Sequence, residues 1–570
     1  MLSLVLLGVA ASKVAPNILV ILTDDQGWGD LDYNCDNSTA MCATTPNLRT
    51  LATSPGSTYF HRFYAAAGVC SPTRASILTG RTHQRDCINF ALSCCQEDPA
   101  ATCAAGNTGA LPTNEFTISD AAHASKLGDY KTIQMGKWHL GDFWDKKLPG
   151  MNKMYPVANP ITSGHFDTWF TTEAEVSSSK PNCGCYPQDN GPMPTSGAPV
   201  SACTGASPTI LPSGGTAGCS LTYLGDKCVV NGGFEGNWAF PCTDYFYPNA
   251  SDPRTVSGLA DWRDPANKVP GDDSIFIVEK FTEFLDERVA DSKPWLAHLC
   301  LHSIHEPHPA MPEFYALYQN DPDYLGTLTQ MDSAIGVLRR EIASRNMGDN
   351  TVVFMTTDNG PHQGAERANI AWSTAHMLRQ CKASIFEGGI RVPGIMYLPP
   401  SIDAAIRPAG NINVTTPVGA LDVLPTVMEL LEVDFKMASP NPSWVLDGVS
   451  LLPFVKPGSD PNAPRPSPLI FSFGNEFEGS QQAIIDNDWK ILTRPSVGQC
   501  DLQPGFNFSL AKTDQFFLFN LKDDVHESRD LALSEPVQFA RMSKLLLEMR
   551  ESINSSRYNE VKCCTADYCP

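Results

Sequence analysis

The 570-residue chain lacks any apolar run long enough to cross a bilayer. Residues 2–11 are apolar or small, but a membrane helix needs about 20 such residues, and charge enters at Lys13. Small residues follow this run, so residues 1–15 are interpreted as a secretory signal peptide, although a basic start is missing. An uncleaved membrane anchor is the alternative interpretation, and no stable membrane insertion is expected elsewhere in the chain.

An excess of basic residues is also missing, because 62 acidic residues outnumber 41 lysines and arginines and give a net charge of −21. The sequence contains no internal repeat, no basic patch and no nucleic-acid-binding motif, so a nucleic-acid partner is not expected. A strongly acidic surface repels polyanions at long range, although salt screens that repulsion within about 10 Å. The acidity is interpreted as a solubility trait, as in a saline habitat.

The sequence also lacks the cysteine spacing of a zinc site. The clustered cysteines at 94–95, 183–185 and 563–564 do not repeat the paired Cys-x-x-Cys spacing of a structural zinc site. Nineteen cysteines behind a signal peptide instead indicate disulfide bonds formed in an oxidising compartment, with Cys300 and Cys381 as candidates for free thiols. A secreted, extracellular or lumenal protein is therefore expected. Glycosylation acceptors fit the same route: Asn37, Asn249, Asn413, Asn507 and Asn554.

Two strands predicted from continuous apolar runs each end in oxygen-bearing side chains. Asp24 and Asp25 follow the first run, and Asp358 and Asn359 follow the second. Such runs are typical of parallel strands buried on both faces, and ligands bind at the carboxyl ends of these strands. Neighbouring carboxylates repel without a cation, so a hard cation is predicted here, calcium in a roomy cage or magnesium in a tight octahedral one. Ordinary turns closing the strands are the alternative interpretation.

Residues 70–74 read Cys-Ser-Pro-Thr-Arg, and Pro72 is tolerated in the first turn of a helix. A helix is predicted to begin at Cys70, and its amide dipoles would face an anion bound there. A structural or disulfide-bonded cysteine beside a helix start is the alternative interpretation.

Three further segments supply cations and proton carriers. Lys137 and His139 follow a strand-like segment and would share one side if the backbone stays extended. His305 is the second histidine of a His-x-x-His-x-Pro pattern, which selects it over two neighbouring histidines, and Lys382 precedes a glycine-broken strand. Taken singly, such residues are more often solvated lysines and structural histidines.

Together and in this order, the segments resemble the formylglycine-dependent sulfatases, the arylsulfatase-like type I family, over about residues 16–533. The resemblance implies that Cys70 is converted to formylglycine by a formylglycine-generating enzyme. Conversion would leave eighteen cysteines, enough for nine bridges. The resemblance also implies one divalent cation, with calcium favoured over magnesium, whose ligands are Asp24, Asp25, the hydrate of residue 70, Asp358 and Asn359.

The implied reaction is hydrolysis of a sulfate monoester to an alcohol and inorganic sulfate through a sulfoenzyme intermediate. One hydroxyl of the residue 70 hydrate attacks sulfur, and His305, helped by Lys382, protonates the departing alcohol. His139 then accepts the proton whose loss expels sulfate. Arg74 holds the hydrate, and Lys137 lies near both hydrate and sulfate. The implied catalytic residues are Cys70, Arg74, Lys137, His139, His305 and Lys382, and the last four also bind substrate.

Two other functions stay open. A formylglycine-dependent phosphonate or phosphate ester hydrolase would share the nucleophile and the metal. A non-catalytic binding protein would be expected to lack at least one key residue, and none is missing. The substrate is expected to be a sulfated small molecule or glycan, whereas neither the leaving alcohol nor the oligomeric state follows from the sequence.

The fold class is predicted as α/β. Helical periodicity at 273–291, 324–344 and 420–432 alternates with the strands, which predicts a large mixed, mostly parallel sheet flanked by helices. The resemblance to sulfatases implies that this fold is similar to that of alkaline phosphatase. Residues 16–464 would form the catalytic domain, with a Cys/Gly/Pro-rich insertion at 171–264 near the pocket mouth. A C-terminal subdomain at 465–570 is predicted to contain a smaller antiparallel sheet, with strands at 468–473, 482–492 and 516–521, a helix at 537–552 and a Cys-containing tail.

Overall fold

The structure, a computed structural model, describes residues 14–35, 42–92, 110–141, 160–172, 272–305, 308, 310, 312–319, 322–362, 378–473, 481–493 and 516–556, and the backbone of four short strands between 220 and 260. A ten-stranded sheet forms its centre. In spatial order its strands are β14 (Ile412–Val414), β2 (Ser57–Phe60), β13 (Gly394–Tyr397), β11 (Thr351–Thr357), β1 (Asn17–Thr23), β10 (Trp295–Cys300), β4 (Lys131–Lys137), β5 (Thr168–Thr172), β8 (Tyr245–Pro248) and β9 (Val256–Ala260).

Five central strands, β11, β1, β10, β4 and β5, run parallel, so their carboxyl ends meet at one edge of the sheet. β13 is antiparallel to β11, β2 is antiparallel to β13, and β14 is parallel to β2. β2 and β14 therefore end at the same edge, which is called the site edge below. The predicted mixed, mostly parallel sheet is confirmed.

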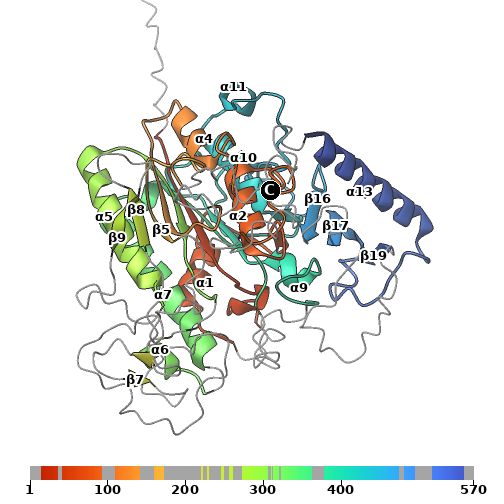
Figure 1. Cartoon of the computed structure of the whole chain (residues 1–570), viewed down its shortest axis with the longest axis horizontal. Coiled ribbons are helices and arrows are strands. Elements are labelled where there is room, and N and C mark those ends of the chain that lie inside the picture. Colours follow the sequence, from red (N-terminus) through yellow and green to blue (C-terminus); the bar gives the residue numbers. More distant parts are fainter. Residues whose placement is uncertain are drawn as a thin grey trace, which may run out of the picture.

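Helices cover both faces of this sheet (Figure 1). Side chains alternate along a strand, and accordingly Ile18, Val20 and Leu22 of β1 pack with one group of helices while Leu19 and Ile21 pack with the other. Both faces of β1 are buried, which explains its unbroken apolar sequence. The first group comprises α2 (Cys70–Thr79), α4 (Ile118–Ala124) and α10 (Val423–Leu430), and the second α1 (Pro46–Thr53), α5 (Ser274–Asp291) and α7 (Pro322–Ser344).

A separate antiparallel sheet follows near the C-terminus, in the order β16-β17-β18-β19. Its strands are β16 (Leu469–Phe473), β17 (Gln481–Asp486), β18 (Trp489–Thr493) and β19 (Phe516–Asn520). One face packs on helix α13 (Pro536–Ser556), which lies beside it in Figure 1. The other face packs on Tyr64 and on residues 385–390. These belong to the part of the chain before residue 465, which is called the large domain below. The predicted small sheet with a helix is confirmed.

Some element boundaries differ from the prediction. Residues 482–492 are not one strand, because Asn487 and Asp488 form the turn of a hairpin between β17 and β18. The predicted helix at 420–432 is a 3-10 turn followed by α10. The predicted insertion at 171–264 begins inside β5 and contains β8 and β9, which extend the main sheet. It also contains the two-stranded sheet of β6 (Ser220–Leu221) and β7 (Cys228–Val229), whereas its other residues and residues 1–13 lie outside the described residues.

The cysteines correct one expectation. Cys300 is a buried free thiol, whereas Cys381 is disulfide-bonded, so its prediction as a free thiol was wrong. Cys35 and Cys42 form a described disulfide. Because Cys70 and Cys300 are both free, seventeen of the nineteen cysteines remain, which permits at most eight bridges rather than nine.

None of the helices in the described parts of the chain is both long and apolar enough to cross a membrane.

Candidate active site

Carboxylates from two neighbouring strands meet at the site edge. Asp24 and Asp25 follow β1, and Asp358 follows the adjacent β11. All three are almost completely buried, and the backbone NH of Asp25 donates a hydrogen bond to Oδ1 of Asp358 at 3.2 Å. Asp25 has a φ of +56°, a left-handed backbone conformation that turns the chain away from the strand. These three residues are called the carboxylate cluster below.

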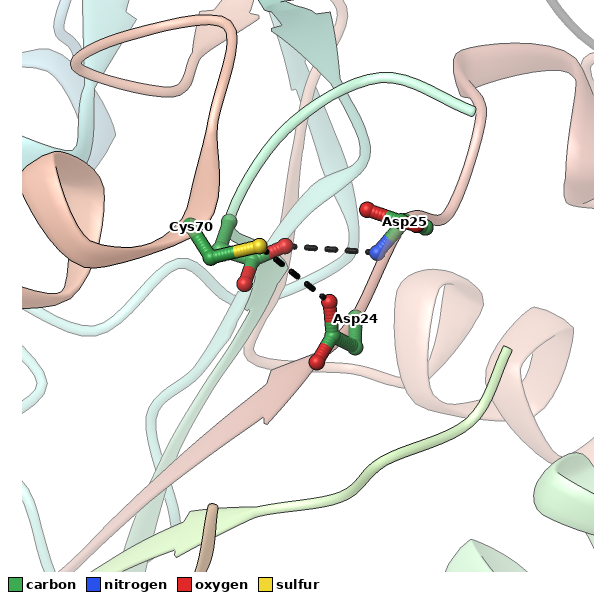
Figure 2. A group of neighbouring side chains, drawn as sticks. Asp24, Asp25 and Cys70 are labelled. Carbon is green, nitrogen blue, oxygen red and sulfur yellow. Dashed lines mark hydrogen bonds between the residues drawn. The ribbon is translucent and has the colours of Figure 1, made fainter. Parts of the chain in front are cut away.

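Cys70 opens helix α2 and faces this cluster. Its Sγ lies 3.7 Å from Oδ1 of Asp24, and the two side chains point toward each other in Figure 2. Cys70 is the first helical residue, as predicted, so free backbone NH groups of the first turn lie beside it. Burial and the neighbouring carboxylate of Asp358 raise the pKa of the Cys70 thiol well above its usual value. An unmodified thiol at this position therefore stays protonated at neutral pH.

Two cations converge on Asp24. Lys137, the last residue of β4, places its Nζ 2.5 Å from Oδ2 of Asp24. Arg74, one helical turn after Cys70, spans two carboxylates, with its Nη2 3.2 Å from Asp24 and 2.7 Å from Asp358. Burial disfavours ionisation of Asp24, but these cations outweigh it and hold the pKa of Asp24 well below its usual value. The two cations are as deeply buried as the carboxylates that they contact.

A second group surrounds Asp25. Lys382 places its Nζ 2.7 Å from Oδ1 of Asp25, and Nε2 of His305 lies 3.7 Å from Oδ2. The amide nitrogen of Asn359 donates to Oδ1 of Asp25 at 2.7 Å. The structure thus brings together eight of the predicted residues: Asp24, Asp25, Cys70, Arg74, Lys137, Asp358, Asn359 and Lys382, with His305 slightly farther out.

The donor set fits a hard cation. Ligand atoms of Asp24, Asp25, Cys70 and Asp358 all lie within 4.8 Å of one another. Among the described residues, Oδ1 of Asn359 is buried without a hydrogen-bond partner, as expected for an oxygen that ligates a metal. The sulfur of Cys70 is the one soft donor, and an oxygen at residue 70 would complete an all-oxygen set of the kind that calcium and magnesium prefer.

His139 differs from its prediction in backbone conformation. It has a φ of +56°, so the chain does not stay extended from Lys137 as assumed. Its Nε2 lies 2.6 Å from the carbonyl oxygen of Leu92 and must donate to it, because a carbonyl only accepts. The neutral ring therefore carries its proton on Nε2 and leaves Nδ1 as the basic nitrogen.

The sequence did not predict two features near His305. His362 stacks on His305 with a ring-centroid distance of 6.3 Å. Its only sequence signal is its place three residues after Asn359. The turn that carries His305 is hydrogen-bonded to Asp24, whose NH donates to the carbonyl of Ser303 at 2.8 Å. Ser303 in turn donates its hydroxyl to the buried carboxylate of Asp272, which stands just before α5.

Comparisons with known proteins identify a family. Residues 16–433 match the family model described as Sulfatase. Arylsulfatase G of Rattus norvegicus is 27% identical over 546 residues, which cover 91% of this chain and 83% of that protein. The solved structure of Ps i-CgsB in complex with k-i-k-neocarrahexaose aligns at 22% identity and a TM-score of 0.60, covering 95% of this chain and 93% of that one. The phosphonate monoester hydrolase of Agrobacterium radiobacter aligns at 15% identity and a TM-score of 0.54, covering 94% and 96%.

Proposed function

The chain belongs to the sulfatase family and is a sulfuric ester hydrolase, and from this premise we propose that it cleaves sulfate monoesters with a formylglycine formed from Cys70. One observation carries the proposal. The side chain of Cys70 stands at a helix start, 3.7 Å from Asp24, inside a buried group of carboxylates and cations. A structural cysteine would not require three carboxylates and three cations around it, because burying such charges is costly.

The charges suit an anionic substrate. The three carboxylates of the cluster are balanced by Arg74, Lys137 and Lys382, so these described side chains sum to about zero. A bound divalent cation makes the group positive, and it would neutralise the sulfuryl oxygens and favour ionisation of an attacking hydroxyl. Asp24, Asp25, Asp358 and Asn359 would hold this cation, with an oxygen of residue 70. Calcium is proposed ahead of magnesium.

The protein side chains have separable tasks. One hydroxyl of the hydrated residue 70 would give up its proton to solvent, and its oxygen would attack sulfur as the bond from sulfur to the ester oxygen breaks. His305, beside Lys382, donates a proton to the departing alcohol. His139 then takes the proton of the second hydroxyl on its basic Nδ1, the bond between the residue 70 carbon and the sulfate oxygen breaks, and sulfate leaves. The aldehyde that remains adds water and returns to the hydrate.

Arg74 and Lys137 hold the carboxylates and the nucleophile in position. Arg74 also donates to the carbonyl oxygen of Lys137 at 3.1 Å, so one guanidinium fixes two carboxylates and the end of β4. Such a planar fork cannot be reproduced by lysine. We assign Arg74 to holding the hydrate and Lys137 to the hydrate and the sulfate.

We further propose maturation by a formylglycine-generating enzyme in the secretory route, with a signal peptide at residues 1–15. The disulfide between Cys35 and Cys42 supports an oxidising compartment. Asn413 and Asn554 are exposed glycosylation acceptors, which is compatible with this route. The substrate class is a sulfated glycan or small molecule.

The first experiment is the mass of the tryptic peptide 63–74 from protein secreted by a host that contains the formylglycine-generating enzyme. Replacement of the CH₂SH group by an aldehyde is expected to lower its mass by ~18 Da. Active protein with an intact thiol or a disulfide at Cys70 would overturn the proposed nucleophile.

A phosphonate or phosphate ester hydrolase is the alternative function, favoured by the shared fold with the phosphonate hydrolase. Matched 4-nitrophenyl esters of sulfate, phosphate and methylphosphonate separate the two. We expect kcat/KM to be about 100-fold higher for the sulfate ester, because differential transition-state binding of about 3 kcal/mol is within reach of a preorganised site. A higher value for the phosphonate would select the alternative.

A further inference from the structure

A cavity of about 740 Å³ lies between the large domain and the C-terminal sheet. One wall comes from residues beyond β2 and β14, including Arg62 and Thr415, and the other from the β17–β18 turn and from residues after β19, including Asp488 and Lys522. Its volume falls in the range of small-molecule binding sites, about 300–1,000 Å³.

Part of the cavity lining lies at the same edge of the main sheet as Cys70. β2 and β14 both end at the site edge, so His61 and Thr415, which follow them, lie on the side of the sheet where Asp24 and Asp358 lie. β2 stands three strands from β1 in the sheet, which corresponds to about 14 Å at the usual strand spacing. Trp28 lines the cavity and is only three residues beyond Asp25, so their Cα atoms are at most about 11 Å apart.

Hydrogen bonds already join the two walls of the cavity. Arg62 donates from Nη1 to Asp488 at 2.8 Å and from Nη2 to the carbonyl oxygen of Asn487 at 2.5 Å, which joins the large domain to the hairpin turn. Arg391 stacks over the Trp28 ring at 5.2 Å and donates to the carbonyl oxygen of His61. The cavity is therefore preformed, and a ligand would not have to supply the energy that orders it.

The charged residues of the cavity lining are mostly basic, whereas the chain as a whole is acidic. Although the chain carries a net charge of −21, the charged lining residues are Arg62, Arg391, Lys522 and one acid, Asp488. Arg62 is neutralised by Asp488, and Arg391 approaches Glu387 at 3.6 Å, so the exposed Lys522 is the cation available at the surface. Amide and hydroxyl side chains such as Asn462 and Thr415 also face this space.

We propose that this cavity is a second subsite for an anionic saccharide chain whose sulfate ester reacts at Cys70. The inference rests on the proposed function. It specifies the substrate as a sulfate ester of an oligosaccharide rather than of a small molecule. Lys522 contacts a sulfate or carboxylate group of the chain. Because Thr415 already donates its hydroxyl to Oδ1 of Asn462, Asn462 donates from its amide nitrogen to the saccharide hydroxyls and Thr415 accepts from them. The ring of Trp28 and the prolines of the lining supply the apolar surface against which sugar rings pack.

The test compares the double variant K522A/N462A with a control, K456A/N411A. All four residues are exposed, but Lys456 and Asn411 are not part of the cavity lining. Each protein is assayed with 4-nitrophenyl sulfate and with sulfated carrageenan-type and glycosaminoglycan hexasaccharides beside their sulfated monosaccharides. The wild-type protein should prefer at least one hexasaccharide to its monosaccharide.

K522A/N462A should lower kcat/KM for that hexasaccharide by about tenfold or more, as expected for loss of a charge-assisted hydrogen bond. Its activity on 4-nitrophenyl sulfate and on the monosaccharide should stay unchanged, as should every activity of K456A/N411A. The subsite is overturned if no hexasaccharide is preferred by the wild-type protein, or if the double variant keeps the preference. Failure of the wild-type protein to hydrolyse any sulfate ester would count against the proposed function itself.

Discussion

Cys70 and Cys300 are both free, buried thiols, but their surroundings differ. Cys70 faces Asp24 at the start of α2, whereas Sγ of Cys300 lies 3.4 Å from Nε2 of His298 at the end of β10. Burial raises the pKa of Cys300 to about 11, so this thiol is protonated as well. Substituting each of these two cysteines in turn therefore distinguishes a reactive thiol from one that only packs in the core.

Cys70→Ala should abolish sulfate ester hydrolysis, with a loss of about 10⁴-fold or more, because the nucleophile is removed. Cys300→Ala should keep its activity within a few-fold. Both should change the free energy of unfolding by only about 1 kcal/mol, since each deletes one small buried group. Initial rates with 4-nitrophenyl sulfate and urea unfolding measure the two effects. Turnover by Cys70→Ala, or its failure to fold, would contradict the assignment.

The sequence was enough to select side chains that the structure brings together, because their types carry the chemistry. It could not show that Lys137 and Arg74 both contact Asp24, since that contact depends on β4 and α2 meeting β1 across the fold. His362 was missed for the same reason. Nothing near it in the chain indicates that its ring would stack on His305.

At the scale of elements, Lys490 ties the C-terminal sheet to helix α9 (Glu387–Ile390). Lys490 of β18 is fully buried, with its Nζ 3.1 Å from Glu387 and 2.8 Å from Glu527. Glu387 begins the helical turn α9, a few residues after Lys382, and it also accepts from the hydroxyl of Tyr64 at 2.9 Å. The C-terminal sheet is therefore tied to the segment that carries Lys382.

Lys490→Met should lower the free energy of unfolding by about 3–5 kcal/mol, because it leaves two carboxylates buried without their shared cation. Lys544→Met is the matched control. Lys544 forms an exposed pair with Glu548 on α13, and such pairs contribute at most about 1 kcal/mol. Urea unfolding of both variants tests this, and equal stability of the two would show that Lys490 does not stabilise the contact between the C-terminal sheet and α9.

Element types followed from the sequence better than element boundaries did. The apolar runs of β1 and β11 were recognisable because both faces of each strand are buried. The hairpin at 481–493 was missed because Asn487 and Asp488 are two polar residues inside an otherwise continuous strand pattern. The contribution of β8 and β9 to the main sheet depends on pairing with β5, which no local pattern reveals.

At the scale of the whole molecule, buried groups make opposing contributions to pH dependence. Burial raises the pKa of Asp30 to about 7 and that of Asp272 to about 6, so the folded state holds their protons longer than the unfolded state. Their contribution to stability is therefore lost as pH rises from about 4 to 7. Burial lowers the pKa of His61 and His83 to about 4, and their contribution is lost as pH falls from about 6.5 to 4.

Asp30 offers a way to isolate one of these contributions. Its carboxyl accepts from the NH of Gly27 at 2.5 Å and from the hydroxyl of Tyr324 at 2.8 Å, and an asparagine can accept both bonds without ionising. Asp30→Asn should match the wild-type protein near pH 4 and become relatively more stable as pH rises. The gain should approach about 1 kcal/mol per pH unit up to pH 7, because the cost of ionising a buried carboxyl is removed.

Urea unfolding at several pH values between 4 and 8 measures this difference, and the histidine contributions cancel because both proteins share them. Asp523→Asn, which changes an exposed carboxylate, is the control and should run parallel to the wild-type protein at every pH. If the stability of Asp30→Asn also changes with pH in parallel with that of the wild-type protein, Asp30 is not protonated in the folded protein. Its ionised carboxylate must then be stabilised by the hydrogen bonds from Tyr324 and Gly27. If the gain appears, stability at neutral pH is limited by buried acids that lie outside the carboxylate cluster.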